Sequence, residues 1–202
     1  LAGTVNLLAV DADISNGPPA GGNVRDDIGP IDRCISISVG NTATIDVVTD
    51  GIPAWVLATR TGGAGGISAD LEYNRRVVNV TAYNTSTSTR LFYAVPAGST
   101  YEQEELTPDV DGRYRFDSSQ IVPFAIDDGE GVMARLTFTA VANGLSILKL
   151  TDTVGDLDQP TGEPRVLNPA GKPYDITTVQ MGVIAVGQAC PADPADADGD
   201  GI

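Results

Sequence analysis

Short runs of apolar and β-branched residues recur along the chain and alternate with polar residues. Alternation with a period of two puts the apolar side chains on one face of a half-buried strand. Glycine, proline, asparagine or aspartate bounds each run, and the pairs Asp128-Gly129 and Asn143-Gly144 flank one run as the turns of a meander would. The pattern predicts strands at residues 4–10, 34–39, 42–49, 67–73, 77–83, 89–95, 114–116, 121–126, 132–141, 146–151 and 180–186.

Helical periodicity is missing from the sequence. No segment repeats apolar residues at the three- and four-residue spacing of an amphipathic helix. The expected fold class is therefore all-β, a two-sheet antiparallel β-sandwich of roughly nine to eleven strands. We expect the sandwich at residues 33–188, an N-terminal strand with a Gly/Pro-rich tether at residues 1–32, and an acidic linker at residues 189–202.

The N-terminal strand has two alternative roles. Its loop, residues 16–33, is rich in Gly, Pro and Asp and gives the strand a longer reach than a hairpin would. The strand either pairs within its own sandwich or adds to the open sheet edge of a neighbouring subunit, where repetition of the contact would build a filament. The residues of this candidate assembly strand are Thr4, Val5, Leu7, Leu8 and Val10.

Composition limits the classes of molecule that the chain can bind and the cellular compartment in which it is expected. The 202 residues carry 12 Lys and Arg against 27 Asp and Glu, a net charge of -15, which disfavours nucleic acid and anionic membranes. No apolar run reaches the length of about 18 residues that a membrane span needs. The chain begins at Leu1 without Met, as a mature product of signal-peptide removal would. We expect a secreted or cell-surface protein.

Two kinds of covalent feature agree with that location. Cys34 and Cys190 lie just before and just after expected strands, so they would form one disulfide in an oxidising compartment, or else remain two buried thiols. Asn79 and Asn84 begin two N-glycosylation sequons, Asn79-Val80-Thr81 and Asn84-Thr85-Ser86. The sequons predict glycans on an exposed face.

The C-terminal tail has the spacing of a calcium loop. Asp196, Asp198 and Asp200 place a carboxylate at every second position, and Gly201 permits a sharp turn. A loop of this type takes a bidentate acid about five residues beyond that glycine, whereas the sequence stops at Ile202. The tail is thus an incomplete Ca²⁺ site or the start of a longer acidic stalk.

Catalysis is disfavoured by the residue types available. The chain has no histidine, which removes His-based triads, most zinc sites and the commonest general base. An enzyme would have to use carboxylates, with Glu102, Glu104 and Asp127 as candidates. These acids fall in expected loops of an acidic protein, so we interpret them as solvated surface and predict no enzymatic activity.

Sugar binding by exposed aromatic side chains is an alternative that the sequence leaves open. Trp55 is expected to cover the core as a lid, or else to form an exposed platform. The glycine-rich residues 62–66 lack the lysine and the helix start of a phosphate-binding loop, and are expected to form a mobile hairpin loop.

Several of the expected strands resemble those of the cohesin family. Residues 39–47 followed by residues 51–53 are similar to the family pattern G-x-x-V-x-V-x-V…G-x-P. Residues 67–80 match the strand pair L-x-Y-D-x-x-x-L-x-V, and residues 131–140 match G-x-x-A-x-x-x-F-x-A. The resemblance spans residues 35–187, with departures in the loop 16–33 and at residues 91–117.

The resemblance implies a surface protein that works by contact. Cohesins are jelly-roll β-sandwich modules of bacterial and archaeal surface and cellulosome scaffolds, and their usual partner is the calcium-loaded dockerin. Residues 190–202 resemble the start of a thrombospondin type 3 repeat. We expect a non-enzymatic structural or adhesive module that assembles by donating its N-terminal strand. The alternative is a carbohydrate-binding or dockerin-type protein-binding module, because fold similarity by itself does not decide between them.

Overall fold

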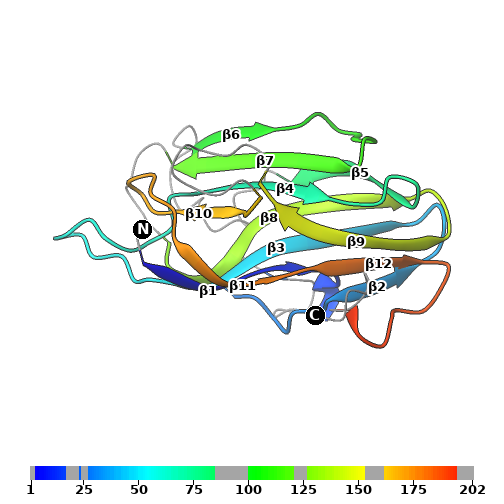
Figure 1. The fold of residues 1–202 in the computed structure, drawn as a ribbon, viewed down its shortest axis with the longest axis horizontal. Helices are drawn as coiled ribbons and strands as arrows, with labels where there is room; N and C mark the ends of the chain where they lie inside the picture. Colours follow the sequence, from blue (N-terminus) through cyan, green and yellow to red (C-terminus); the bar gives the residue numbers. More distant parts are fainter. Residues whose placement is uncertain are drawn as a thin grey trace.

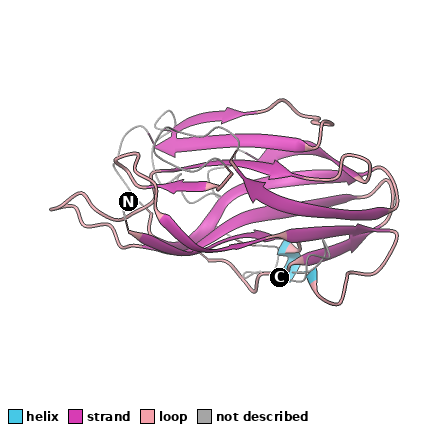
Figure 2. Cartoon of the chain, viewed as in Figure 1, coloured by secondary structure: helices cyan, strands magenta, loops and turns pink. Residues whose placement is uncertain are grey.

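The computed structural model describes residues 3–16, 23, 27–84, 100–120, 127–152 and 162–194. In these residues the fold is all-β, with a short 3-10 helix at Ile14–Asn16, as the alternating pattern predicts (Figures 1 and 2). The strands are β1 (Thr4–Asp11), β2 (Cys34–Ile37), β3 (Thr42–Ile52), β4 (Gly66–Glu72), β5 (Val78–Asn84), β6 (Thr100–Glu104), β7 (Arg113–Gln120), β8 (Gly129–Ala140), β9 (Gly144–Thr151), β10 (Arg165–Leu167), β11 (Asp175–Gln180) and β12 (Gly182–Val186).

Two sheets form the sandwich. The five-stranded sheet has the order β11-β1-β3-β8-β5, and the seven-stranded sheet has the order β2-β12-β9-β4-β7-β6, with β10 paired to β4. Inward-facing aromatic side chains fill the space between the sheets, and the ring of Tyr73 meets that of Phe138 edge-on at 5.5 Å. Tyr114 and Phe116 from β7 are fully buried in the same core.

The sheets are mixed, which corrects the expectation of a purely antiparallel sandwich. β1 runs parallel to β11, and β2 runs parallel to β12. Each parallel pair joins a strand near the N-terminus to one near the C-terminus. Parallel pairing requires a long connection between the two strands, and here most of the chain forms that connection. Local hairpin signals in the sequence carry no information about these two pairings.

β1 lies inside its own sandwich. It pairs with β11 on one side, where Thr4 stands opposite Asp175, and with β3 on the other, where Leu7 stands opposite Asp50. Val5, Leu8 and Val10 are fully buried in the main core. The sequence leaves two roles open for this strand, and in the structure the strand pairs within its own sandwich.

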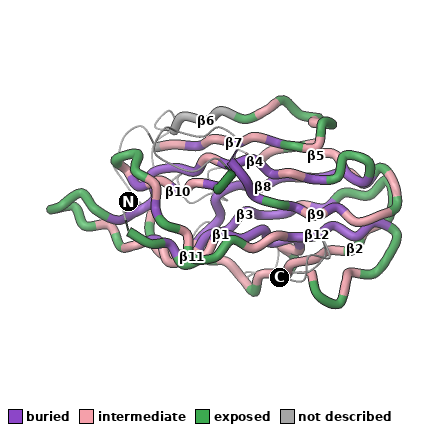
Figure 3. The backbone as a smooth tube through the Cα atoms, viewed as in Figure 1, coloured by how far each residue is buried: buried purple, intermediate pink, exposed green. Residues whose placement is uncertain are grey.

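A loop segment covers part of the outer face of the five-stranded sheet. Residues 23 and 27–33, here called the strap, belong to the loop that the sequence suggests as a tether. Ile28 and Ile31 of the strap pack on Ala9, Val48 and Val132, which form a second small core outside the sheet. The buried tube segments of β1, β3 and β8 in Figure 3 therefore have apolar contacts on both faces.

The weakest sequence predictions concern sheet edges. β6, β10 and β11 were not predicted, and β10 and β11 are a three-residue strand and an exposed edge strand in which few side chains are buried. The predicted strand 180–186 corresponds to β12 (Gly182–Val186), and Gln180 at its start belongs to β11, which lies in the other sheet. The expected strands at residues 89–95 and 121–126 lie outside the described residues.

The glycine-rich run is not the expected mobile hairpin loop. Gly62 to Gly66 are all buried, and a Cβ at Gly65 would lie 2.2 Å from the main-chain oxygen of Asn168. Glycine is required here because two backbone segments approach closely. The exposed hairpin precedes the run and is closed by pairing between Val56 and Thr61.

The disulfide prediction is confirmed. Cys34 at the start of β2 is bonded to Cys190 after β12, with their Cα atoms 6.0 Å apart. The bond joins the two ends of the sandwich, residues separated by 156 positions, beside a parallel strand pair.

Replacing both cysteines by alanine is expected to lower the free energy of unfolding by about 3–5 kcal/mol, because the open chain regains the entropy that the cross-link removes. Urea denaturation of the variant and of the oxidised protein measures the difference. The wild-type protein in reductant should behave as the variant does, and equal midpoints for variant and oxidised protein would contradict the prediction.

Candidate functional site

The outer faces of the two sheets differ in what covers them. The strap packs on part of the five-stranded sheet, whereas most outward side chains of β4, β7 and β9 are half-buried or exposed, with Asp70 and Thr151 buried among them. This accessible face combines charged and apolar groups. Its members on these strands are Ser68, Glu72, Arg113, Arg115, Asp117, Leu145, Ile147 and Lys149, and Arg165 of β10 lies opposite Ser68.

Arg115 of β7 organises the charged part of this face. Its guanidinium donates to Asp117 at 2.8 Å and to Asp152 at 3.2 Å, lies 3.4 Å from Asp70, and also donates to the Ser68 hydroxyl at 3.0 Å. Asp70 and Asp152 are almost completely buried, at 0% and 1% exposure. Buried carboxylates need such partners, so Arg115 has a structural role as well as a place on the surface.

A shallow depression of about 580 Å³ lies next to this network. Leu145 and Ile147 of β9 and Met181, at the junction of β11 and β12, supply its apolar surface. Lys149 lies in its wall two residues beyond Ile147, and Glu72 lies opposite on β4. We call this depression the hollow.

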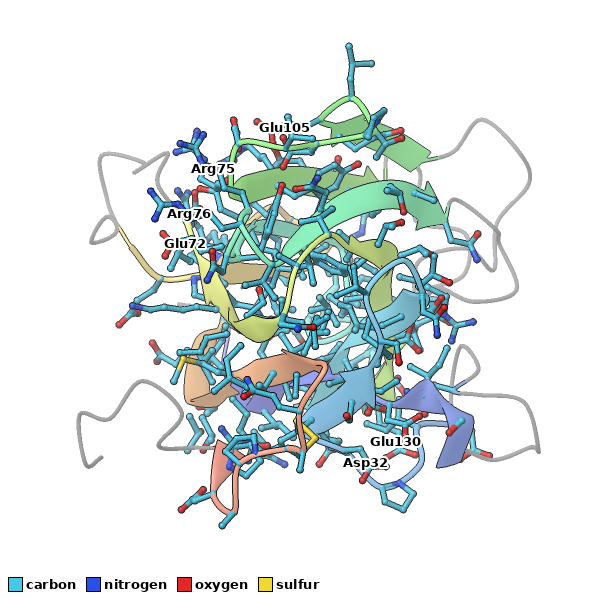
Figure 4. The ribbon with its side chains drawn as sticks, turned by 90° about the vertical axis from the view of Figure 1, so that its right-hand side faces the viewer. Asp32, Glu72, Arg75, Arg76, Glu105 and Glu130 are labelled. Atoms are coloured by element: carbon cyan, nitrogen blue, oxygen red, sulfur yellow. A yellow bond between two sulfur atoms is a disulfide. The ribbon has the colours of Figure 1, made fainter. Side chains whose placement is uncertain are left out.

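The turn between β4 and β5 is held in a defined shape at the end of the hollow. The main-chain oxygen of Asn74 accepts hydrogen bonds from the amides of Val77 and Val78, and its side-chain oxygen accepts one from the amide of Arg76. Arg75 and Arg76 are both exposed there. Figure 4 shows them at the same corner of the molecule as Glu72.

Tyr73 anchors this turn to the neighbouring loop. Its hydroxyl donates to Asp109, both to the carboxylate at 2.6 Å and to the main-chain oxygen at 2.9 Å. Burial and the hydrogen bond to Asp109 raise the pKa of Tyr73 well above its usual value, so the phenol stays protonated as a donor.

The covered face holds a separate polar network. Arg135 donates to both carboxylate oxygens of Asp46 at 2.6 Å and to the main-chain oxygen of Asn23 at 2.8 Å. The Asn23 amide in turn donates to Asp11 at 2.7 Å and to Asp46 at 3.2 Å. Asp11 also accepts from the amide of Asp32 at 3.0 Å. The network therefore fastens the strap to β1, β3 and β8.

Burial changes the acidity of both carboxylates in this network. It raises the pKa of Asp11 to about 6 and also raises the pKa of Asp46, against the opposing effect of Arg135. Both side chains are inaccessible, at 1% and 0% exposure, and their hydrogen bonds are made within the fold. We interpret them as structural groups.

Stability should increase as the pH falls from 7 to 5. The folded chain binds a proton on Asp11 in this range, while an unfolded aspartate near pKa 3.8 does not, so protons favour the folded state. The expected gain in the free energy of unfolding is about 1 kcal/mol, measured by urea denaturation across the range. The gain should shrink in Asp11→Asn, and a steady loss of stability toward pH 5 in both proteins would contradict this.

Removal of Arg115 should destabilise the fold. Arg115→Ala leaves the buried Asp70 without this guanidinium, and we expect a loss of about 3 kcal/mol in the free energy of unfolding. Lys149→Ala on the same face is the matched control, because an exposed side chain should cost less than about 0.5 kcal/mol. Equal thermal midpoints for the two variants would show that the ion pairs contribute little.

The other predicted site residues are scattered. Asp196, Asp198 and Asp200 lie outside the described residues, so the calcium expectation stays a prediction. Asn79 and Asn84 both lie on β5, half-buried, and their glycosylation also stays a prediction.

The residues of the catalytic alternative do not form a site among those described. Glu104 is exposed and Asp127 half-buried, in separate segments, and the side chain of Glu102 lies outside the described residues. Tyr73, Tyr114 and Tyr174 are buried, which removes them from any aromatic sugar-binding platform. Trp55 is half-buried beside Leu57 and Pro169. It is therefore neither a fully buried lid over the core nor a fully exposed platform.

Comparison with known proteins gives matches at the level of structure. No family model and no curated protein matches the chain. A type II cohesin from Acetivibrio cellulolyticus, solved with an X-dockerin, has a TM-score of 0.60 at 13% identity and covers 90% of this chain and 99% of its own. The sandwich is cohesin-like.

Two further structures support this assignment of the fold. A type II cohesin domain from the cellulosome of the same organism has a TM-score of 0.58 at 12% identity, covering 90% of this chain and 95% of its own. A non-cellulosomal cohesin from the archaeon Archaeoglobus fulgidus has a TM-score of 0.51 at 11% identity, covering 76% and 86%. At such identities the cohesin-like similarity establishes the fold and leaves the partner undetermined.

Sequence reasoning did not find the accessible face. Its key residues are single outward positions on β4, β7 and β9, which look like ordinary solvated strand positions in the sequence. The one available signal was the clustering of scarce cations at Arg75, Arg76, Arg113 and Arg115 in an acidic chain.

Proposed function

We propose that the chain is a non-catalytic protein-binding module of an extracellular scaffold, and that its partner docks on the accessible face of the seven-stranded sheet. The observation that carries the proposal is the asymmetry of the sandwich. The strap packs on part of one outer face, over β1, β3 and β8, while the other presents Arg115 of β7 and Ile147 and Lys149 of β9. A stiff sheet face with central apolar groups and surrounding charge is suited to protein recognition.

The cohesin-like neighbours support the class of partner. Several were solved as complexes with dockerins, including a type I complex from Clostridium thermocellum and a sixth cohesin from the Acetivibrio cellulolyticus scaffoldin B. We therefore propose a dockerin-type module or another surface protein as the partner. The Cys34–Cys190 disulfide and the net charge of -15 favour secretion or display at the cell surface. None of the helices in the described part of the chain is long and apolar enough to cross a membrane.

Strand donation is a less favoured mechanism for this chain. β1 is paired on both sides in its own sheet, and Val5, Leu8 and Val10 are fully buried. A donated β1 would leave β3 and β11 with unpaired edges and open the core to water. The binding-module function needs no such rearrangement.

A biosensor measurement tests the proposal. The purified chain is immobilised and titrated with a panel of purified type I and type II dockerin modules in calcium. Ile147→Glu, on the accessible face, should weaken binding at least tenfold, because a buried charge would oppose docking. Thr44→Glu, on the outer face of the five-stranded sheet, is the control and should bind normally.

Circular dichroism establishes that both variants are folded. Absence of binding to every module in the panel would contradict a dockerin-type partner. Equal weakening by both substitutions would contradict the assignment of the face.

A further inference from the structure

We infer that an extended segment of another polypeptide binds as an additional strand beside residues 149–151 of β9. The binding site is a slot on one side of the sandwich, between β9 and β11. This strand-accepting site goes beyond the proposed function and does not depend on a dockerin as the partner. The pairing of the strands is the observation that carries it.

β9 changes its neighbours along its length. β12 pairs with one side of it from Gly144 to Leu148, and β4 pairs with the other side from Lys149 to Thr151. Beyond Leu148, no strand among the described residues continues the place of β12. That side of residues 149–151 is therefore an open sheet edge, and an open edge is a template for an extended chain.

The chain that would continue beside β9 passes through the other sheet instead. The Tyr174 amide donates to the main-chain oxygen of Val166 in β10 at 2.9 Å, so the chain lies beside the seven-stranded sheet at this point. The next residues form β11, which pairs with β1 in the five-stranded sheet. At Gly182, opposite Leu148, the chain is back in the seven-stranded sheet. In Figure 1 this segment is the orange strand that runs on from β11 into β12.

A slot of about 490 Å³ lies where the chain makes this detour. Leu150, Pro164 and Tyr174 are its buried members, and Ile176 and Val179 of β11 supply further apolar surface. Stacked sheets lie about 10 Å apart and paired strands about 4.8 Å apart, so a detour of one sheet spacing leaves room for one extended chain.

The charges around the slot are balanced. Its charged lining residues are Lys149, Glu163, Arg165 and Asp175, and Arg165 is already paired with the buried Asp152 at 2.7 Å. The slot therefore favours no charged occupant, and main-chain hydrogen bonds and apolar contacts would supply the affinity. Because alternate side chains of a strand point to opposite faces, the occupant should carry an apolar residue at every second position.

A peptide titration tests the strand-accepting site. Synthetic peptides of about nine residues, the length of a long strand, alternate threonine with valine, isoleucine or leucine. Each is titrated into the isotopically labelled chain and followed by NMR. We expect saturable shifts and slower hydrogen exchange at the amides of residues 149–151 and 175–181. The same peptides with methylated backbone nitrogens keep their side chains but lose their donors, and they should not bind.

Two exposed valines provide a matched pair of variants. Val179 lines the slot and is 41% exposed, whereas Val141 lies after β8, away from the slot, and is 43% exposed. Val179→Lys should weaken peptide binding about fivefold or more, because docking would desolvate the added charge. Val141→Lys should bind normally. Equal weakening by both, equal binding of the methylated peptides, or no binding of any peptide would overturn the inference.

The slot and the proposed docking face can be separated by experiment. Ile147 lines the hollow and not the slot, so Ile147→Glu should leave peptide binding unchanged. If dockerins bind and no peptide does, the proposed function stands and the strand-accepting slot falls. If a peptide binds in the slot and no dockerin binds, the slot stands and the dockerin assignment falls.

Discussion

The placement of β1 between β11 and β3 is the constraint on which the rest of the structure depends. β1 supplies backbone partners to the edge strand β11 and to β3, which would otherwise be an edge, and its inward side chains fill the core beneath them. Because β1 enters from the N-terminus and β2 begins after the strap, residues 27–33 cross the outside of the same sheet. The buried pair of Arg135 and Asp46, joined by Asn23, then holds that crossing segment in place.

This arrangement makes the two outer faces unequal, and the proposed recognition face is the one opposite the strap. One face is used to bury Ile28, Ile31 and a network of hydrogen-bonded carboxylates. The other keeps most of its strand surface accessible, with Arg115 neutralising the buried Asp70. Arg115 lies on the proposed recognition side and at the same time pairs with the buried Asp70 and Asp152.

The fold was largely predictable, whereas the candidate site was not. Alternation identified the strands that bury one side, such as β3, β4 and β8, and the turns bounding β8 were correctly placed. The edge strand β11 escaped because none of its positions is buried. Outward positions such as Lys149 and Glu72 carry no periodic signal, and their proximity follows from the pairing of β4 with β9.

The sequence by itself determined the all-β class, because strand periodicity and turn residues are local, and it suggested the disulfide, because two cysteines flanked the expected sandwich. Tertiary structure alone decided that β1 pairs with β3 and β11, that the glycine run is buried, and that the loop before β2 becomes a strap. These outcomes depend on contacts between residues distant in the chain. A local pattern specifies which side chains are apolar and will be buried. The residues that they pack against are determined only when the two sheets assemble.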